Sequence, residues 1–309
     1  MKLNQYVFIL VSLILLVFSS CKSTEKNSAN NAVQTLAQKT LGNRSGTIIV
    51  MKAENNEIIA LATNQNPETL YSAGSLSYLP IVKFLLEEKS FSLDSKTVCN
   101  GSTEINGKKI SCSAVAGHGN ISLKDAFAKT CDVFFAENIH NLDSDLLLKT
   151  AEQFNFEISD KSWLLYPYNN ARANPLQMAQ MMASICKDDS NTGKTLKDLL
   201  RYRVTNGNPQ FPLKNGSVQI AGTVATAEVP EIKTFAEIKT FGKWNSWCVV
   251  YAPYNASVKE QIVVSVLIDA NNDWEWYAPY AANIVMQGYF NNQSYEEAIV
   301  ELGFQKPLR

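Results

Sequence analysis

Strand-like segments lie at both ends of the folded part of this 309-residue chain, and helical patterns lie between them. Two apolar, β-branched runs at residues 47–51 and 57–63 flank a turn signal and predict a hairpin of largely buried strands. Three more such runs follow at residues 218–228, 247–251 and 261–268. We therefore predict an α/β (α+β) fold in which both chain ends build one mostly antiparallel sheet of about five strands, flanked by helices.

Helical spacing of apolar residues marks the middle of the chain. Residues 76–88 carry apolar side chains at intervals of three and four, which predicts a helix. Ser122 is a good N-cap for a helix through Ala128. Further helices are predicted at residues 133–140, 145–154, 176–186 and 277–290, whereas residues 91–120 read as a loop and residues 190–216 receive no assignment.

The N-terminus has the pattern of an export signal. A short charged start precedes an almost unbroken apolar run at residues 6–18, and Ser19-Ser20-Cys21 closes it. This pattern resembles a bacterial lipoprotein signal peptide of residues 1–20, with Cys21 as the acylated first residue. A transmembrane anchor is the alternative, but the run is short for a span. We expect a lipid-anchored protein of the bacterial cell envelope that faces the periplasm, on either the inner or the outer membrane.

Composition constrains the rest of the chain. Residues 21–45 are rich in Ser, Asn, Thr and Lys and predict a flexible tether, followed by one domain at residues 46–309. The 28 basic and 29 acidic residues leave a net charge of −1, so nucleic acid is not an expected partner.

Five segments in the same order resemble the motifs of the penicillin-binding protein transpeptidase domain. They are residues 46–63, Ser75-Leu76-Ser77-Tyr78, Thr130-Cys131-Asp132, Asn174-Pro175-Leu176-Gln177-Met178-Ala179 and Gly222-Thr223-Val224-Ala225-Thr226-Ala227. The resemblance runs from about residue 46 to residue 290 and implies a β-lactamase/transpeptidase-like fold. It also implies acyl transfer through a serine ester, with the boxes Ser-x-x-Lys, Ser-x-Asn and Lys-Thr-Gly.

All three catalytic boxes depart from that pattern. Ser75 stands where the family has its nucleophile, but Tyr78 replaces the lysine that takes the serine proton. A phenol with a pKa near 10 is a poor base at neutral pH. Lys83 cannot substitute, because eight residues of helix place it about 12 Å along the axis. Ser75 is alternatively only a helix N-cap or a first-turn serine.

The other two boxes lose an amide and a lysine. Thr130 retains a hydroxyl in the second box, whereas Asp132 replaces a donor amide by an acceptor-only carboxylate. In the third box Thr223 replaces the lysine that the resemblance assigns to the substrate carboxylate, and Thr226 matches the last hydroxyl.

These departures favour a catalytically degenerate member that binds peptidoglycan stem peptides, a β-lactam-like ligand or cell-wall synthesis proteins. The alternative is an active or residual serine acyltransferase, a DD-transpeptidase or penicillin-binding enzyme, that uses Ser75. A Tyr78 side chain that fills the pocket favours the first interpretation. An Asp132 of raised pKa that points at Ser75 favours the second.

Four residues predict a metal site. Cys99, Cys112, His118 and Cys131 form a plausible tetrahedral zinc set, and their order resembles a zinc site beside the Ser-x-Asn box of some elongation-type penicillin-binding proteins. A Cys99–Cys112 disulfide is the alternative in an exported protein, with Cys131 as a small buried residue. Cys186 and Cys248 are expected in the core.

Overall fold

The fold is that of a computed structural model, which describes residues 30–87, 91–140, 142–158, 171–207, 212–228, 243–271 and 277–304. The predicted signal peptide of residues 1–20 and its Cys21 lie outside these ranges. Every helix within them is too short or too polar to span a lipid bilayer.

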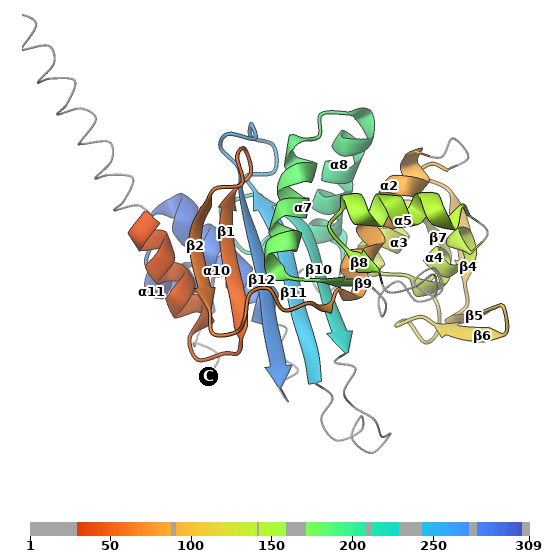
Figure 1. Cartoon of the computed structure of the whole chain (residues 1–309), viewed down its shortest axis with the longest axis horizontal. Helices are drawn as coiled ribbons and strands as arrows, with labels where there is room; N and C mark the ends of the chain where they lie inside the picture. Colours follow the sequence, from red (N-terminus) through yellow and green to blue (C-terminus); the bar gives the residue numbers. More distant parts are fainter. Residues whose placement is uncertain are drawn as a thin grey trace, which may run out of the picture.

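A five-stranded sheet forms the centre of the molecule (Figure 1). In spatial order its strands are β10 (Ala221–Glu228), β11 (Lys243–Ala252), β12 (Ile262–Asn271), β1 (Gly46–Lys52) and β2 (Ile58–Thr63). All four neighbouring pairs are antiparallel. The N-terminal hairpin thus pairs with the last strand, and the predicted sheet built from both chain ends is confirmed.

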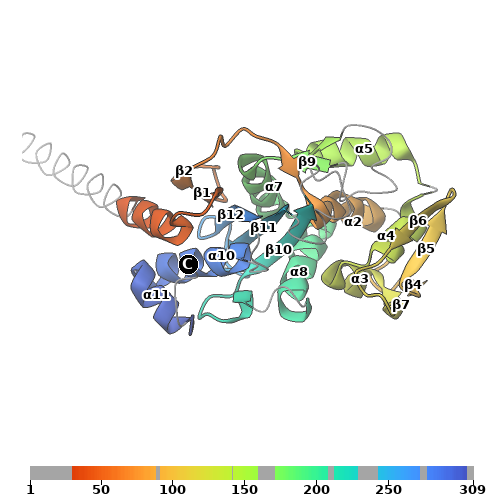
Figure 2. The ribbon, with the colours of Figure 1, turned by 90° about the horizontal axis from the view of Figure 1, so that it is seen from below.

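Alternate side chains of the sheet enter two apolar layers on its opposite faces. Ile48 and Val50 pack with α10 (Tyr277–Asn291), whereas Ile49 and Met51 face the layer that contains α7 (Pro175–Lys187). Figure 2 shows α7 and α10 on the two sides of the sheet. Continuous apolar runs suit strands that are covered on both faces, which explains why these strands do not alternate in polarity.

A largely helical region lies beside the β10 end of the sheet (Figure 1). It contains a 3₁₀ helix η1 (Gly74–Ser77), α2 (Tyr78–Glu87), α3 (Leu123–Lys129), α4 (Asp132–Ile139) and α5 (Ser144–Gln153). Ser122 caps α3, as predicted, by accepting from the Asp125 amide. The prediction of a loop over residues 91–120 is wrong. Two small antiparallel pairs form there, β4 (Lys96–Cys99) with β7 (Gly119–Ser122) and β5 (Ser102–Ile105) with β6 (Lys108–Ser111).

The predicted tether of residues 21–45 is wrong for its described part, because residues 30–41 form a helix. Val33, Leu36, Ala37 and Leu41 repeat at helical spacing and are buried. From the same helix Gln34 donates to the Leu61 carbonyl at 2.8 Å and accepts from the Leu61 amide at 2.9 Å. The side chain therefore covers backbone groups on the outer edge strand β2, which would otherwise be open to pairing.

Helix α7 begins with a reciprocal capping box that supports a local prediction. Asn174 accepts from the Gln177 amide, and the Gln177 side chain accepts from the Asn174 amide, both at 2.8 Å. We expect Asn174→Ala to lower the free energy of unfolding by about 1 kcal/mol, because one helix N–H loses its acceptor. Urea unfolding measures the loss. Asn174→Ser keeps a capping oxygen and serves as control, and equal losses in both variants would contradict the capping role.

Candidate active site

Ser75 lies in η1, where the chain passes the edge of the sheet. Gly74 has a φ of +54°, and a Cβ at this position would lie 2.7 Å from the Thr226 carbonyl oxygen, so glycine permits the close approach to β10. The N-cap of η1 is Ala73 and Ser75 lies in its first turn, so Ser75 is the first-turn serine of the alternative interpretation and not an N-cap. The Ser75 hydroxyl donates to the Val224 carbonyl at 3.4 Å, a long bond, and the residue is only 9% exposed.

Tyr78 fills the position of the missing lysine. Its side chain is 1% exposed and stacks on Phe135, with ring centroids 4.0 Å apart and an interplanar angle of 19°. Its hydroxyl donates to the Asp132 carboxylate in a short hydrogen bond. Burial raises the pKa of Asp132 to about 7, although the bond from Tyr78 partly offsets this shift. The Asp132 carboxylate therefore accepts from Tyr78, whereas the Ser75 hydroxyl donates to a backbone carbonyl.

The second and third boxes meet beside η1. Thr130 ends α3 in the left-handed conformation, at φ 55° and ψ 61°, and Asp132 begins α4 one residue beyond Cys131. On β10, Thr226 is partly exposed, whereas Thr223 is completely buried. The Thr223 hydroxyl lies 3.4 Å from the Val224 carbonyl, so it is out of reach of an external ligand.

Arg203 joins these boxes from helix α8 (Asn191–Asn206). The side chain is 1% exposed and donates to the Phe127 carbonyl, to the Thr130 hydroxyl at 3.0 Å and to the Val224 carbonyl at 3.0 Å. Burial lowers the pKa of the guanidinium to about 10, so it stays protonated at neutral pH. Within the described part of the chain it forms no ion pair. A fixed positive charge therefore lies between the second and third boxes, although both family lysines are absent.

Arg203 was missed because residues 190–216 received no assignment. Leu196, Leu199, Leu200 and Val204 are buried at helical spacing, and Arg203 falls on the same apolar face. An arginine on the buried stripe of a helix is a recognisable signal for a paired or functional charge. The position of Arg203 on this apolar stripe was therefore the sequence signal that could have identified it.

The four predicted metal ligands converge at the start of α4. Cys99 ends β4, Cys112 follows β6, His118 precedes β7 and Cys131 caps α4. Their ligand atoms all lie within 4.8 Å of one another, and Cys112 Sγ is 3.5 Å from His118 Nδ1. The three cysteines are buried free thiols. The set matches the Cys₃His chemistry of structural zinc sites.

The thiols of this cluster are coupled. A hydrogen bond shared with Cys131 lowers the pKa of Cys112 to about 4, and the same bond together with burial raises that of Cys131. A bound zinc ion would deprotonate the coordinating thiols and replace this hydrogen bond by coordination. Cys186 and Cys248 lie outside the cluster and are buried in the core, as expected.

The structure thus brings together residues from all three boxes. Ser75 and Arg203 share the Val224 carbonyl, Arg203 also holds Thr130, and Tyr78 holds Asp132.

Comparison with known proteins places this arrangement in a family. The family model described as the penicillin binding protein transpeptidase domain matches residues 46–287. Comparison with curated protein sequences returned no match.

Solved structures of the same family share the fold. The D,D-transpeptidase domain of a peptidoglycan glycosyltransferase from Eggerthella lenta is 19% identical, with 84% of this chain and 81% of that chain covered and a TM-score of 0.70. PBP2 from Pseudomonas aeruginosa, in complex with WCK 5153, is 17% identical over 83% of this chain and 76% of its own, with a TM-score of 0.68.

PBP2 of Helicobacter pylori, in its complex with MreC, is 17% identical, with a TM-score of 0.68. The match covers 88% of this chain but 63% of that protein. At these identities the structures show a common fold, and the family match covers most of the chain. The chain therefore belongs to the penicillin-binding protein transpeptidase domain family.

Proposed function

We propose that this chain is a catalytically inactive member of the family that uses its transpeptidase fold for binding. The observation that carries the proposal is the Tyr78 side chain, which is buried, stacked on Phe135 and bonded to Asp132 in the place of the lysine base. The Ser75 hydroxyl bonds to a backbone carbonyl, and the lysine that would remove its proton is replaced by Tyr78. Asp132 has a raised pKa, but its bond to Tyr78 argues against a role as substitute base for Ser75.

The ligand class follows from the family and from the position of β10 at the edge of the sheet. β10 carries Thr226, which is partly exposed. We infer that a binding groove lies along this edge and takes a peptidoglycan stem peptide or a segment of a cell-wall synthesis protein. Two similar structures are of assemblies, the Helicobacter pylori PBP2–MreC complex and a peptidoglycan synthase complex. These assemblies support binding to a cell-wall synthesis protein as one candidate for this chain.

The proposal extends to the anchor and the metal. A lipid on Cys21 would hold the domain at a bacterial membrane, facing the periplasm. One structural zinc ion on Cys99, Cys112, His118 and Cys131 would fasten β4, β6 and β7 to the start of α4. Its position one residue from Asp132 supports a role in holding the second box in place.

Groove binding is tested with immobilised full-length chain and soluble peptidoglycan fragments, together with a cross-linked envelope extract. Thr226→Asp places a charge beside the groove, and we expect it to weaken binding at least about tenfold, equivalent to about 1.4 kcal/mol. Thr205→Asp, at an exposed position of α8, serves as the control. The absence of both peptidoglycan fragments and synthesis proteins, or equal binding by the two variants, would contradict the proposal.

A further inference from the structure

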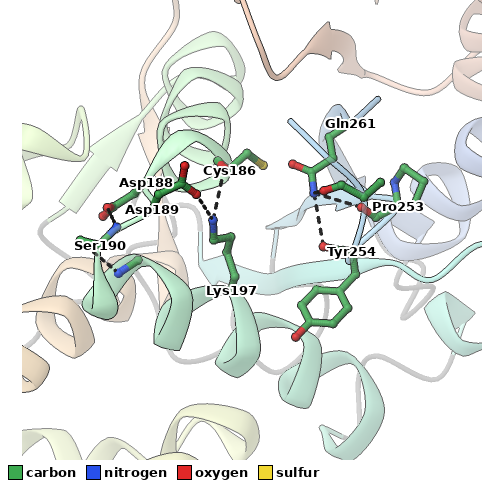
Figure 3. A network of polar contacts seen from close by, with 10 residues as sticks. Cys186, Asp188, Asp189, Ser190, Lys197, Pro253, Tyr254 and Gln261 are labelled. Atoms are coloured by element: carbon green, nitrogen blue, oxygen red, sulfur yellow. Dashed lines mark hydrogen bonds and ion pairs between the residues drawn. The ribbon is translucent and has the colours of Figure 1, made fainter. Parts of the chain in front are cut away.

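A second candidate site lies at the other end of α8, away from Arg203. There the turn from α7 into α8 and the turn between β11 and β12 line a cavity of about 490 Å³. Figure 3 shows polar side chains from both turns, among them Gln261, together with Lys197 of α8. Its lining includes charged side chains of both signs: Lys187, Lys194, Lys197, Asp189 and Asp198. The volume falls within the range of about 300–1,000 Å³ that small-molecule sites occupy.

Gln261 supplies an unused acceptor in the wall of this cavity. The residue is 4% exposed, and its Nε2 donates to the carbonyls of Pro253 at 3.0 Å, Ala256 at 3.2 Å and Tyr254 at 3.3 Å. These bonds fix the amide, and its Oε1 has no partner within the described residues. Figure 3 shows that this oxygen points to the side where Lys197 lies. A buried acceptor without a partner destabilises the fold, and a donor on a ligand would remove that cost.

Lys197 supplies an ammonium with weak partners. Its side chain is 16% exposed, and Nζ lies 3.4 Å from the Cys186 carbonyl and 3.5 Å from the Asp189 carboxylate, which is itself 90% exposed. Both distances are long for hydrogen bonds of a charged group. Two other charged residues of the wall have closer partners, since Asp198 accepts from Tyr254 and Lys187 donates to Asn56 at 3.0 Å.

We propose that this cavity binds a small organic carboxylate that also carries an N–H group, of the class of an N-acylated amino acid or the C-terminal residue of a peptide. The carboxylate pairs with Lys197 and the N–H donates to Gln261 Oε1. The Asp189 and Asp198 carboxylates disfavour a phosphate dianion, which would also leave the acceptor of Gln261 with at most a weak donor. The site does not depend on the function of the Ser75 region.

Ligand-observed NMR with the full-length chain in detergent tests both contacts. N-acetylglycine carries one N–H and one carboxylate, and N-acetylsarcosine differs by a methyl group in place of that N–H. We expect N-acetylglycine to bind with a Kd in the millimolar range and N-acetylsarcosine to bind at least about tenfold more weakly. Inorganic phosphate is the third probe, and we expect no measurable competition from it.

Variants of Lys197 complete the test. We expect Lys197→Gln to weaken N-acetylglycine binding at least about tenfold and Lys197→Arg to retain it, with Lys149→Gln on the exposed side of α5 as the control. If Lys197→Gln does not fold, the two probes on the unaltered chain still decide. Absence of N-acetylglycine binding, equal binding of the two probes, stronger binding of phosphate, or equal binding by Lys197→Gln and Lys149→Gln would overturn the proposal.

Discussion

Removal of the proposed zinc ion from the cluster of Cys99, Cys112, His118 and Cys131 is expected to lower the melting temperature by more than about 10 °C. The four ligands join three short strands to the start of α4, and β4–β7 and β5–β6 are only pairs of four-residue strands. Such small pairs are not stable alone. Structural zinc contributes about 10–16 kcal/mol in small zinc-binding peptides. Loss of about 5 kcal/mol here would shift the melting temperature by about 10–20 °C.

Native mass spectrometry gives the metal content, and thermal unfolding with and without a chelator gives the shift. The two histidines of the chain form a matched pair of variants. His118→Ala should lose zinc and stability, whereas His140→Ala, at the end of α4, should retain the metal. A metal-free protein that is two hydrogens lighter than the reduced chain would instead indicate the Cys99–Cys112 disulfide and contradict the zinc site.

Replacement of Arg203 by methionine is expected to cost about 3 kcal/mol of unfolding free energy. The substitution removes donors from the Phe127 carbonyl, the Thr130 hydroxyl and the Val224 carbonyl. Each buried acceptor left unpaired costs about 1–3 kcal/mol, and the Val224 carbonyl keeps another donor, the Ser75 hydroxyl at 3.4 Å. Removal of a buried guanidinium recovers part of this cost, because methionine carries no charge to desolvate.

Urea unfolding compares this variant with Arg201→Met. The Arg201 side chain lies on the same helix and donates to the Ile220 carbonyl at 2.7 Å. We expect the loss of this hydrogen bond to cost only about 1 kcal/mol of unfolding free energy. Equal costs for the two substitutions would show that Arg203 does not hold the second and third boxes together.

The sequence predicted the five-stranded sheet better than it predicted the helix at residues 30–41 and helix α8. The five strands are long β-branched or apolar runs, and such runs identify buried strands without any knowledge of their partners. The helix at residues 30–41 was missed because its polar composition outweighed the spacing of Val33, Leu36, Ala37 and Leu41. The helical stripe of α8 was missed because residues 190–216 received no assignment.

Within the site, motif order located the boxes but not their contacts. The bond from Tyr78 to Asp132 spans 54 residues of sequence, and the bond from Arg203 to Thr130 spans 73. No local pattern encodes such a pairing, because it depends on how α2, α4 and α8 pack together. The convergence of Cys99, Cys112, His118 and Cys131 could be predicted, because the chain has few cysteines and histidines and these residue types often share a metal site.

Loss of Ser75 activation is tested most directly by intact-mass spectrometry of the folded protein after hours with a fluorescent penicillin. An active transpeptidase domain serves as positive control and Ser75→Ala as negative control. The buried Tyr78, bonded to Asp132, predicts that the unaltered chain gains no adduct and matches Ser75→Ala. A penicillin adduct on the unaltered chain that disappears in Ser75→Ala would show an activated serine and contradict the assignment as an inactive member of the family.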